Sequence, residues 1–505
     1  MSSSFHGATL LGIEALLVEV EVRLLAGQMG RFLLTGLPGA AVRESRDRVK
    51  AAITAAGFRF PRRSLLVHLA PGDLRKEGPL LDLPIALGVL QASEQLQGRR
   101  LKRLLVAGEL ALDGRIRSVR GILPIASLAS RLGLDGLLAP SGCAGQAALS
   151  PDVPAYGVSS LAEAVAFLRG DLDLPPATPD GPLPARPEVG NLDEVRGQGE
   201  AKQALVVAAA GLHNLLLVGP PGSGKTMLAR RMASLLPDLT EQQALECARI
   251  RSVDDPDFQG VDRRPPFRAP HHTCSSVALT GGGSVIRPGE VTRAHHGLLF
   301  LDEFPEFPRN AIEALRQPLE DRVITVSRAA GSVTFPAEIC LLAAMNPCPC
   351  GYRGHTRIAC RCPPAVVQRY VQRVSGPILD RFDLCVEVPA MDVRKYFEPP
   401  ERNETVNLKE RVRAAREVQM RRLRGEGMLV NSQMGTGAIE RHCELKGEAR
   451  ELLLRSAERQ NLSARAIGRV LRVSRTVADL REAREISSAD IAFALSCRFV
   501  MHRLE

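Results

Sequence analysis

The apolar residues of the first 170 positions follow strand and helix periods in alternation. Residues 15–24 read A-L-L-V-E-V-E-V-R-L, and this alternation of apolar and charged residues predicts a half-buried strand. Residues 41–56 have the spacing of an amphipathic helix. Residues 108–121 predict a hairpin whose turn is Asp113-Gly114, a pair that favours tight turns between antiparallel strands. The N-terminal third therefore predicts a mixed α+β domain.

The middle of the chain has a different pattern, in which short runs are apolar throughout. Residues 215–218 (L-L-L-V), 297–301 (G-L-L-F-L) and 339–344 (I-C-L-L-A-A) suit buried parallel strands. Residues 323–335 instead alternate on both sides of a turn, which predicts a hairpin. From Gly447 onward, helical patterns follow one another. We expect an α/β core followed by an all-helical lid.

A proline-rich stretch separates the first two regions. Six prolines lie between positions 175 and 187, so this segment is extended and packs no core of its own. We expect an N-terminal domain at residues 1–170, a linker at 171–188, a core at 189–397 and a helical lid at 398–505.

Composition narrows the class of protein. The chain has 505 residues, is 45% hydrophobic, and contains no apolar run near the ~20 residues of a membrane span. With no signal-peptide pattern at its start, we expect a cytoplasmic protein without a membrane partner. The net charge of +10 permits nucleic-acid binding without showing it. Aromatic residues make up only 4%, so base stacking is not expected to dominate recognition.

The strongest chemical signal follows the first buried strand of the core. The sequence G-P-P-G-S-G-K-T fits the phosphate-binding P-loop, and the strand before it and the helical pattern after it supply the context the motif needs. Backbone N–H groups of such a loop surround phosphate at a helix N-terminus. Lysine would contact the outer phosphates of ATP, and threonine would ligate Mg²⁺. The expected ATP-binding residues are Gly219, Pro220, Pro221, Gly222, Ser223, Gly224, Lys225 and Thr226.

Two carboxylates end the next apolar run. Asp302 and Glu303 follow it some seventy residues beyond the P-loop, which is the order of a Walker B motif. Asp302 would hold Mg²⁺ through water, and Glu303 would polarise the water that attacks phosphate. Asn346 closes the 339–344 run, and a polar side chain there resembles sensor 1 of AAA+ ATPases.

Two arginines continue the resemblance to AAA+ modules. Arg381, in I-L-D-R-F-D-L, resembles the arginine finger that completes a neighbouring subunit's site, and therefore implies an oligomer. A helix-end salt bridge is the alternative for this residue. Arg465, in S-A-R, would be sensor 2, a cation over the phosphate of its own subunit. The run from Glu410 to Arg424 is rich in arginine, and is either a solvated helix face or a surface for DNA phosphates.

The N-terminal third resembles the proteolytic domain of Lon in two stretches. These are Lys76–Pro79 (K-E-G-P) and Gly108–Arg115 (G-E-L-A-L-D-G-R). The Lon mechanism needs a serine and a lysine at places that here fall at about Leu80 and Leu123, and neither can transfer a proton. The resemblance therefore implies the fold without the peptidase.

Further stretches narrow the AAA+ resemblance to the magnesium-chelatase-like branch. P-F-R-A-P-H-H at residues 266–272, G-G-G at 281–283 and P-G-E at 288–290 lie between the P-loop and the Walker B motif. Together with the Lon-like start, they make the whole chain similar to the bacterial ComM/YifB family. This resemblance implies a hexameric ATPase, a helicase that moves single-stranded or branched DNA by branch migration during natural transformation and recombination. The motor subunit of a metal chelatase and an ATP-switched scaffold remain alternatives.

The sequence offers two places for DNA. Arg328 lies near the tip of the 323–335 hairpin, which resembles the pore hairpin of MCM-type helicases, and one cation there would touch phosphate. A surface arginine beside a turn is the alternative. Arg268, in the segment from Arg263 to Arg293, is the second candidate. That segment and the residues directly after it hold histidine pairs that invite a metal interpretation. Adjacent histidines are poor chelates on one face, so packing or pore roles are preferred; the four residues are His271, His272, His295 and His296.

Four cysteines form a compact pattern, C-x-C, nine residues, then C-x-C. Four thiolates suit tetrahedral Zn²⁺, and a site made only of protein ligands would be structural. Four reduced thiols in a loop are the alternative. The expected ligands are Cys348, Cys350, Cys360 and Cys362.

Overall fold

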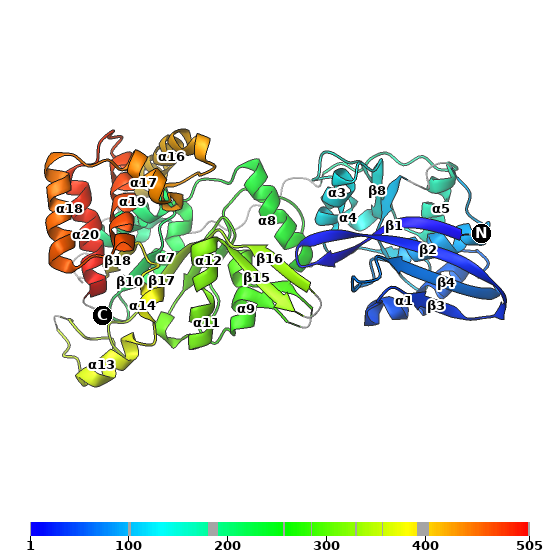
Figure 1. Cartoon of the computed structure of the whole chain (residues 1–505), viewed down its shortest axis with the longest axis horizontal. Coiled ribbons are helices and arrows are strands. Elements are labelled where there is room, and N and C mark those ends of the chain that lie inside the picture. Colours follow the sequence, from blue (N-terminus) through cyan, green and yellow to red (C-terminus); the bar gives the residue numbers. More distant parts are fainter. Residues whose placement is uncertain are drawn as a thin grey trace.

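The computed structural model describes residues 2–98, 103–179, 190–255, 258–283, 285–328, 331–355, 357–390 and 403–502. Two bodies lie end to end along the long axis (Figure 1), the first an α/β unit and the second a parallel sheet with helices around it. The second half of the expected 171–188 linker and the expected boundary near residue 398 lie outside the described residues. No helix within those ranges is both long and apolar enough to cross a membrane.

A seven-stranded mixed sheet forms the N-terminal body, in the order β3-β4-β2-β1-β5-β8-β9. The predicted strand at residues 15–24 and helix at 41–56 are confirmed as β2 and α1. The predicted hairpin is the antiparallel pair β6–β7. The strands are β1 (Ser2–Leu11), β2 (Glu14–Met29), β3 (Phe32–Thr35), β4 (Arg63–Ala70), β5 (Leu104–Val106), β6 (Glu109–Leu110), β7 (Ile116–Arg117), β8 (Gly136–Pro140) and β9 (Ala155–Val158); the helices are α1 (Ala40–Ala55), α2 (Asp82–Ala92), α3 (Ile122–Arg131), α4 (Ser141–Ala147) and α5 (Leu161–Arg169).

The helix α2 is buried almost all around, and its one charge is neutralised inside the domain. Asp82 is fully buried, and Arg48 of α1 donates to its carboxylate through Nε at 2.7 Å and Nη2 at 3.0 Å. The hydrogen bond to Asp82 raises the pKa of Arg48. Leu80 and Leu123, where a peptidase would need its serine and lysine, are buried in apolar clusters. The Lon-like relation of this domain stays a prediction.

The second body is built on five parallel strands in the order β11-β14-β17-β10-β18. The three central strands β14, β17 and β10 are apolar and buried throughout, as expected of parallel strands covered on both faces. The predicted 323–335 hairpin is the antiparallel pair β15–β16. The strands are β10 (Leu215–Val218), β11 (Phe267–Arg268), β12 (Gly281–Gly282), β13 (Arg287–Pro288), β14 (Leu298–Leu301), β15 (Val323–Arg328), β16 (Gly331–Pro336), β17 (Cys340–Met345) and β18 (Leu384–Glu387); the helices are α6 (Gly199–Gly211), α7 (Lys225–Met232), α8 (Glu241–Asp254), α9 (Ser276–Thr280), α10 (Glu290–Arg293), α11 (Arg309–Ala314), α12 (Arg316–Asp321), α13 (Pro364–Val371) and α14 (Gly376–Leu379).

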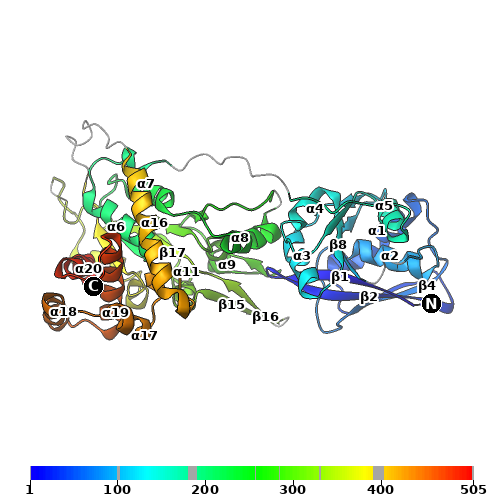
Figure 2. The same cartoon turned by 90° about the horizontal axis from the view of Figure 1, so that it is seen from above.

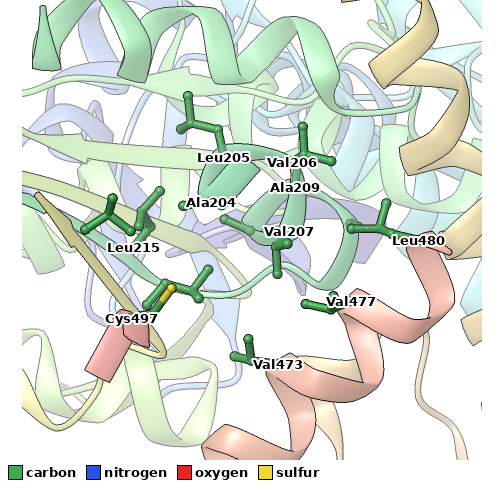
Figure 3. Close-up of a cluster of buried hydrophobic side chains, with 14 of the residues drawn as sticks. Ala204, Leu205, Val206, Val207, Ala209, Leu215, Val473, Val477, Leu480 and Cys497 are labelled. Atoms are coloured by element: carbon green, nitrogen blue, oxygen red, sulfur yellow. The ribbon is translucent and has the colours of Figure 1, made fainter. Parts of the chain in front are cut away.

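The predicted helical lid is confirmed in the described residues and shares one apolar core with the sheet. Figure 3 shows Val207 of α6 pointing toward Val473 and Val477 of α19, and Leu215 of β10 and Cys497 of α20 belong to the same cluster. The lid helices are α16 (Glu404–Leu423), α17 (Thr436–His442), α18 (Gly447–Gln460), α19 (Ala464–Leu480) and α20 (Ser488–His502).

The arginine-rich helix α16 is only partly a solvated face. Arg416 donates through Nη2 to Ala209 O at 2.6 Å, which satisfies a carbonyl near the end of α6. Arg422 is held by the buried Asp479. Lys409 and Arg411 on the same helix are exposed. The sequence pattern thus mixes arginines that fasten the lid to the core with residues that face water.

The described parts of the two bodies meet at α3 and at the tip of the β1–β2 hairpin (Figure 2). The helix α3 packs against α8, where Gly121 N donates to Ser252 O at 2.7 Å. The tip of the β1–β2 hairpin rests on β16, and Gly12 (φ +63°) lies so close that an added Cβ would come within 2.5 Å of Val333 Cγ1. Glycine is therefore required at this tip by both its backbone and its neighbour.

Candidate functional site

The P-loop connects β10 to α7 at the carboxyl edge of the parallel sheet, where ligands of such sheets bind. Gly222 (φ +74°) and Gly224 (φ +90°) have left-handed backbones, and the space where a Cβ would stand is open at both. A Cβ on Gly219 would lie 2.2 Å from Val388 O. The glycines therefore serve two purposes: they form an open cradle for phosphate and allow close packing against Val388, the residue after β18.

Lys225 lies across this cradle, with its residue only 8% exposed. Its Nζ donates to Gly219 O at 2.7 Å, Pro220 O at 2.9 Å and Asn346 Oδ1 at 3.1 Å. Burial lowers the pKa of Lys225, while the charge of Asp302 acts in the opposite direction. The predicted P-loop lysine and the predicted sensor asparagine thus meet, although 121 residues separate them in the chain.

Thr226 and Asp302 meet on the same edge. The Thr226 hydroxyl donates to Asp302 Oδ2 at 2.6 Å, and the Glu303 N–H donates to Asp302 Oδ1 at 2.9 Å. A hydroxyl and a carboxylate side by side beside a phosphate cradle are the oxygen ligands that Mg²⁺ prefers. The residues therefore fit Mg²⁺ bound with the phosphates of ATP.

Glu303 carries two unusual features. Its backbone has φ +52°, a strained conformation for a residue with a side chain, and such strain concentrates at functional sites. Its carboxylate contacts His272, with Nδ1 and Oε2 2.9 Å apart. Sequence reasoning quoted His272 without giving it this role. The available signal was its position just after the strand β11, whose carboxyl end faces the same edge.

Arg381 and Arg465 come together on one carboxylate. Both guanidinium groups contact Glu320 of α12, and their charges offset the effect of burial and lower the pKa of Glu320. The two arginines line a cavity of about 840 Å³ between the core and the lid, and within the described residues no P-loop residue lines it. The structure thus brings Arg465 to Arg381, and not to the Lys225 cradle. Nothing in the sequence indicated Glu320.

The two candidate DNA contacts differ in what the structure offers. Arg268 donates to Glu290 through Nε at 2.7 Å and Nη2 at 3.0 Å, so its guanidinium is held in a two-point ion pair. Binding phosphate would require breaking that pair. Arg328 lies at the end of β15, opposite Gly331, and its side chain lies outside the described residues.

The four cysteines converge as a metal site requires. Cys348 Sγ lies 3.4 Å from Cys350 Sγ and 3.6 Å from Cys360 Sγ, and Cys362 also belongs to the cluster. Four thiolates at ~2.3 Å from a tetrahedral Zn²⁺ would lie slightly farther apart than this. Backbone N–H groups of Tyr352 and Arg361 lower the pKa of Cys350 to about 6, which favours the thiolate. The donor set therefore fits Zn²⁺.

The cysteine loop lies directly against the nucleotide cradle. It begins two residues after Asn346, and a Cβ on Gly351 (φ +83°) would come within 2.4 Å of Pro221 Cδ. The loop and the P-loop are therefore in contact at a point where even a methyl group does not fit.

The second histidine pair forms a hydrogen-bonded cluster with Glu246 of α8. His296 Nε2 lies 2.8 Å from Glu246 Oε2, and His295 Nε2 lies 3.5 Å from the same oxygen. The N–H of Glu338 donates to His295 Nδ1 at 3.1 Å, so neutral His295 carries its proton on Nε2, the atom that a metal would need bare. This geometry favours the expected packing role over a metal.

Family models match the chain in three segments. A model described as magnesium chelatase, subunit ChlI, matches residues 191–396, which contain the sheet and the P-loop. A model for subunit ChlI of Mg-chelatase matches residues 20–142, and one for the ChlI C-terminal region matches residues 402–498.

Curated proteins extend the likeness to the full length. The chain is 43% identical to the competence protein ComM of Haemophilus influenzae over 502 residues, 98% of this chain and 97% of that one. It is 40% identical to YifB of Escherichia coli over 503 residues, 99% of this chain and 97% of that one. The 38 kDa magnesium-chelatase subunit of Cereibacter sphaeroides is 26% identical over 210 residues, 38% of this chain and 56% of that one. The chain therefore belongs to the ComM/YifB family of magnesium-chelatase-like AAA+ proteins.

Proposed function

We propose that this chain hydrolyses ATP as one subunit of a ring, most simply a hexamer, that drives branch migration of DNA. The observation that carries the ATPase part is the meeting of Lys225 with Asn346 and of Thr226 with Asp302 at one edge of the sheet. A lysine, an amide, a hydroxyl and a carboxylate around an open glycine cradle are the groups that phosphoryl transfer from Mg²⁺-ATP requires.

Each residue then has one task. The P-loop N–H groups and Lys225 bind the phosphates, and Thr226 and Asp302 hold Mg²⁺. Glu303 accepts a proton from the attacking water, and Asn346 places that water. Arg381 and Arg465 neutralise charge on a neighbouring subunit's phosphates, because both belong to the Glu320 cluster and line its cavity away from the cradle of their own chain.

The DNA part rests on different support. Full-length similarity to a protein named for competence, a net charge of +10 and the two-stranded β15–β16 hairpin all favour a polyanionic polymer. We propose that the hairpin, through Arg328, contacts DNA phosphates in the pore. Arg268 remains a weaker candidate because Glu290 holds it.

The motor subunit of a metal chelatase is the second candidate, because all three matching family models carry that description. Against it, the compared chelatase subunit aligns with only 38% of this chain, whereas ComM aligns with 98%. An ATPase rate that rises with porphyrin and ignores DNA would favour this candidate.

The test is steady-state ATPase of the full chain, alone and with forked or four-way DNA. We expect hydrolysis that DNA stimulates, and a loss of about 100-fold or more in Lys225→Ala, because the phosphates lose their principal cation. Lys409→Ala, which removes an exposed lysine from the lid helix α16, is the matched control and should hydrolyse ATP as the wild type does. Hydrolysis that survives Lys225→Ala would contradict the site, and hydrolysis indifferent to DNA would contradict the proposed polymer.

A further inference from the structure

We propose that the exposed arginines of the cysteine loop and of α13 form a second contact surface for DNA, which binds the phosphate backbone without reading base sequence. The basic patch is defined here as the side chains of Arg353, Arg357, Arg361 and Arg369, all of them exposed residues. This inference rests on the DNA motor proposed above, and it adds a contact beside the nucleotide cradle to the contact proposed for the β15–β16 hairpin.

The segment that carries the basic patch contains no acidic residue. Residues 347–379 include five arginines and one histidine, but neither aspartate nor glutamate. At the average of this chain, 56 acidic residues in 505, a stretch of that length would hold roughly four. Four thiolates on one Zn²⁺ would carry a net negative charge of about two, which five arginines exceed. The segment therefore concentrates positive charge with or without the metal.

The patch arginines also lack acidic partners from other segments. Within the described residues, none of their four guanidinium groups makes an ion pair. Arg373, just beyond α13, instead contacts Glu306, with Nη1 and Oε2 2.5 Å apart. On the arginine-rich helix α16, Arg413 lies 3.7 Å from Glu417. Arginines without a carboxylate can bind phosphate without first breaking an ion pair.

The cysteine loop holds its arginines in a defined arrangement. The sulfurs of Cys348, Cys350 and Cys360 lie within 3.6 Å of one another, which brings the two ends of the loop together. The backbone N–H of Arg353 is hydrogen-bonded to Cys348, and that of Arg361 to Cys350. The backbone at both arginines thus faces the sulfurs, while the residues themselves are exposed to water. A loop ordered in advance loses less conformational entropy on binding than a free one.

Exposed apolar side chains lie beside these arginines in the sequence. Ile358 follows Arg357 and is 45% exposed, and Val366 of α13 is 40% exposed. A solvated charged surface needs no such residues. Cations next to exposed apolar groups favour a partner that offers phosphates together with apolar sugar and base surface, and this partner is a nucleic-acid strand.

The basic patch is accessible and adjoins the nucleotide cradle. Figure 1 shows α13 at the lower left, projecting from the body on the side away from the N-terminal body. At its other end the cysteine loop packs on the P-loop, where Gly351 meets Pro221. A strand bound here would lie beside the cradle, so the binding of DNA and the binding of ATP would be thermodynamically coupled.

The test is equilibrium binding of fluorescently labelled forked DNA to the full chain over a range of salt concentrations. The patch variant replaces three arginines together: Arg353→Gln, Arg357→Gln and Arg361→Gln. The matched control removes the same charge from three exposed arginines that already contact a carboxylate: Arg103→Gln, Arg115→Gln and Arg455→Gln.

We expect the patch variant to lose about 2 from the slope of log K against log salt, since each phosphate contact contributes about 0.7–0.9. At a fixed salt concentration near 0.1 M it should bind about tenfold more weakly, and equally so for strands of different sequence. The control should keep the wild-type slope and affinity. A wild-type slope in the patch variant, or an equal loss in the control, would overturn the proposal.

A second variant addresses the fold of the loop. Arg357→Glu lies outside both C-x-C pairs, and should weaken DNA binding more than Arg357→Gln does, with zinc content and melting temperature unchanged. If DNA binding falls only together with zinc content or melting temperature, the arginines serve the loop itself and the proposal is wrong. Loss of the wild-type assembly in sedimentation would assign the patch to a neighbouring subunit, and would equally overturn it.

The measurements also distinguish this inference from the function on which it rests. Wild-type hydrolysis that ignores DNA would contradict the proposed motor, even where DNA binding depends on the patch. If DNA stimulates wild-type hydrolysis and the patch variant binds DNA as the wild type does, the patch proposal fails and the motor stands.

Discussion

At the scale of single residues, several carboxylates of this protein each contact two partners, most of them distant in the sequence. Glu320 serves two arginines, Glu246 serves two histidines, and Asp302 accepts from both Thr226 and the Glu303 backbone. One carboxylate between two donors holds both at fixed positions, whereas separate pairs would leave each side chain its own freedom. Shared carboxylate acceptors therefore fix the positions of side chains in the site and in the clusters beside it.

The Glu246 cluster makes a prediction about acid stability. Hydrogen bonds from His295 and His296 hold the pKa of Glu246 at about 2, against burial and below its ordinary 4.5. Because the folded pKa is depressed, the cluster stabilises the fold fully above pH 4.5, and that contribution is lost as the pH falls toward 2. Glu246→Gln should melt about 1–2 °C below wild type near pH 5, a small effect because Glu246 is partly exposed.

Thermal unfolding of both proteins across pH 7 to 3 checks this. The two melting temperatures should converge as the pH falls below 4.5. A constant difference across the whole range would mean that glutamine disturbs packing, and that the ionised carboxylate contributes nothing of its own.

At the scale of elements, the pattern of apolar residues predicted which strands and helices form. Which of these elements contact one another depends on the tertiary fold. The runs at 215–218, 297–301 and 339–344 became β10, β14 and β17, because short apolar runs between breakers suit buried parallel strands. Parallel strands end at one edge, so the contact of Lys225 with Asn346 follows from their positions at strand ends. The pairing of Arg465 with Glu320 does not follow, since it depends on how the lid is set against the core.

Disrupting the cysteine loop should affect the P-loop as well as the loop itself. The purified chain should carry about one zinc, and Cys360→Ser should lose it, because three thiolates hold the metal less well than four. As Gly351 packs on Pro221, loss of the metal should also lower the ATPase rate by several-fold, through a displaced P-loop.

Elemental analysis and steady-state hydrolysis, measured on the same preparation, check both parts. Cys274→Ser, which changes a half-exposed cysteine outside the loop, is the control and should retain zinc and activity. If the wild-type chain contains no zinc, the metal proposal is wrong and the four cysteines are reduced thiols in a loop.

At the scale of the whole molecule, the residues proposed to form one ATPase site lie in two separate places. The cradle holds Lys225, Thr226 and Asp302, while Arg381 and Arg465 line a separate cavity with Glu320. The S-A-R motif and its resemblance to sensor 2 of AAA+ modules suggested that Arg465 acts within its own subunit. The shared carboxylate instead favours both arginines acting on the next subunit, so that one chain is incomplete as an ATPase.

A mixing experiment decides between these arrangements. Lys225→Ala and Arg465→Ala should each be nearly inactive alone. In mixed rings, an Arg465→Ala subunit offers an intact cradle to the intact Arg465 of a Lys225→Ala neighbour. We expect mixing to restore a measurable fraction, roughly a quarter, of wild-type hydrolysis if subunits mix at random and the interfaces act independently.

The control is a mixture of Lys225→Ala with Glu303→Gln, two defects of the same cradle, which should stay inactive in every proportion. If the mixture of Lys225→Ala and Arg465→Ala also hydrolyses no ATP although the subunits co-assemble, Arg465 acts within its own chain.

The close contact of Gly12 with Val333 has a consequence for how the two bodies can move relative to each other. The tip of the β1–β2 hairpin fits β16 without room for one more carbon atom, and the far ends of those same strands run through the middle of the seven-stranded sheet. If the β15–β16 hairpin moves during the proposed ATPase cycle, it must either carry the N-terminal body with it or slide past the glycine at the tip of the β1–β2 hairpin. The close fit at Gly12 therefore couples the position of the N-terminal body to that of the β15–β16 hairpin, so that the outline of the subunit would change whenever the hairpin moves.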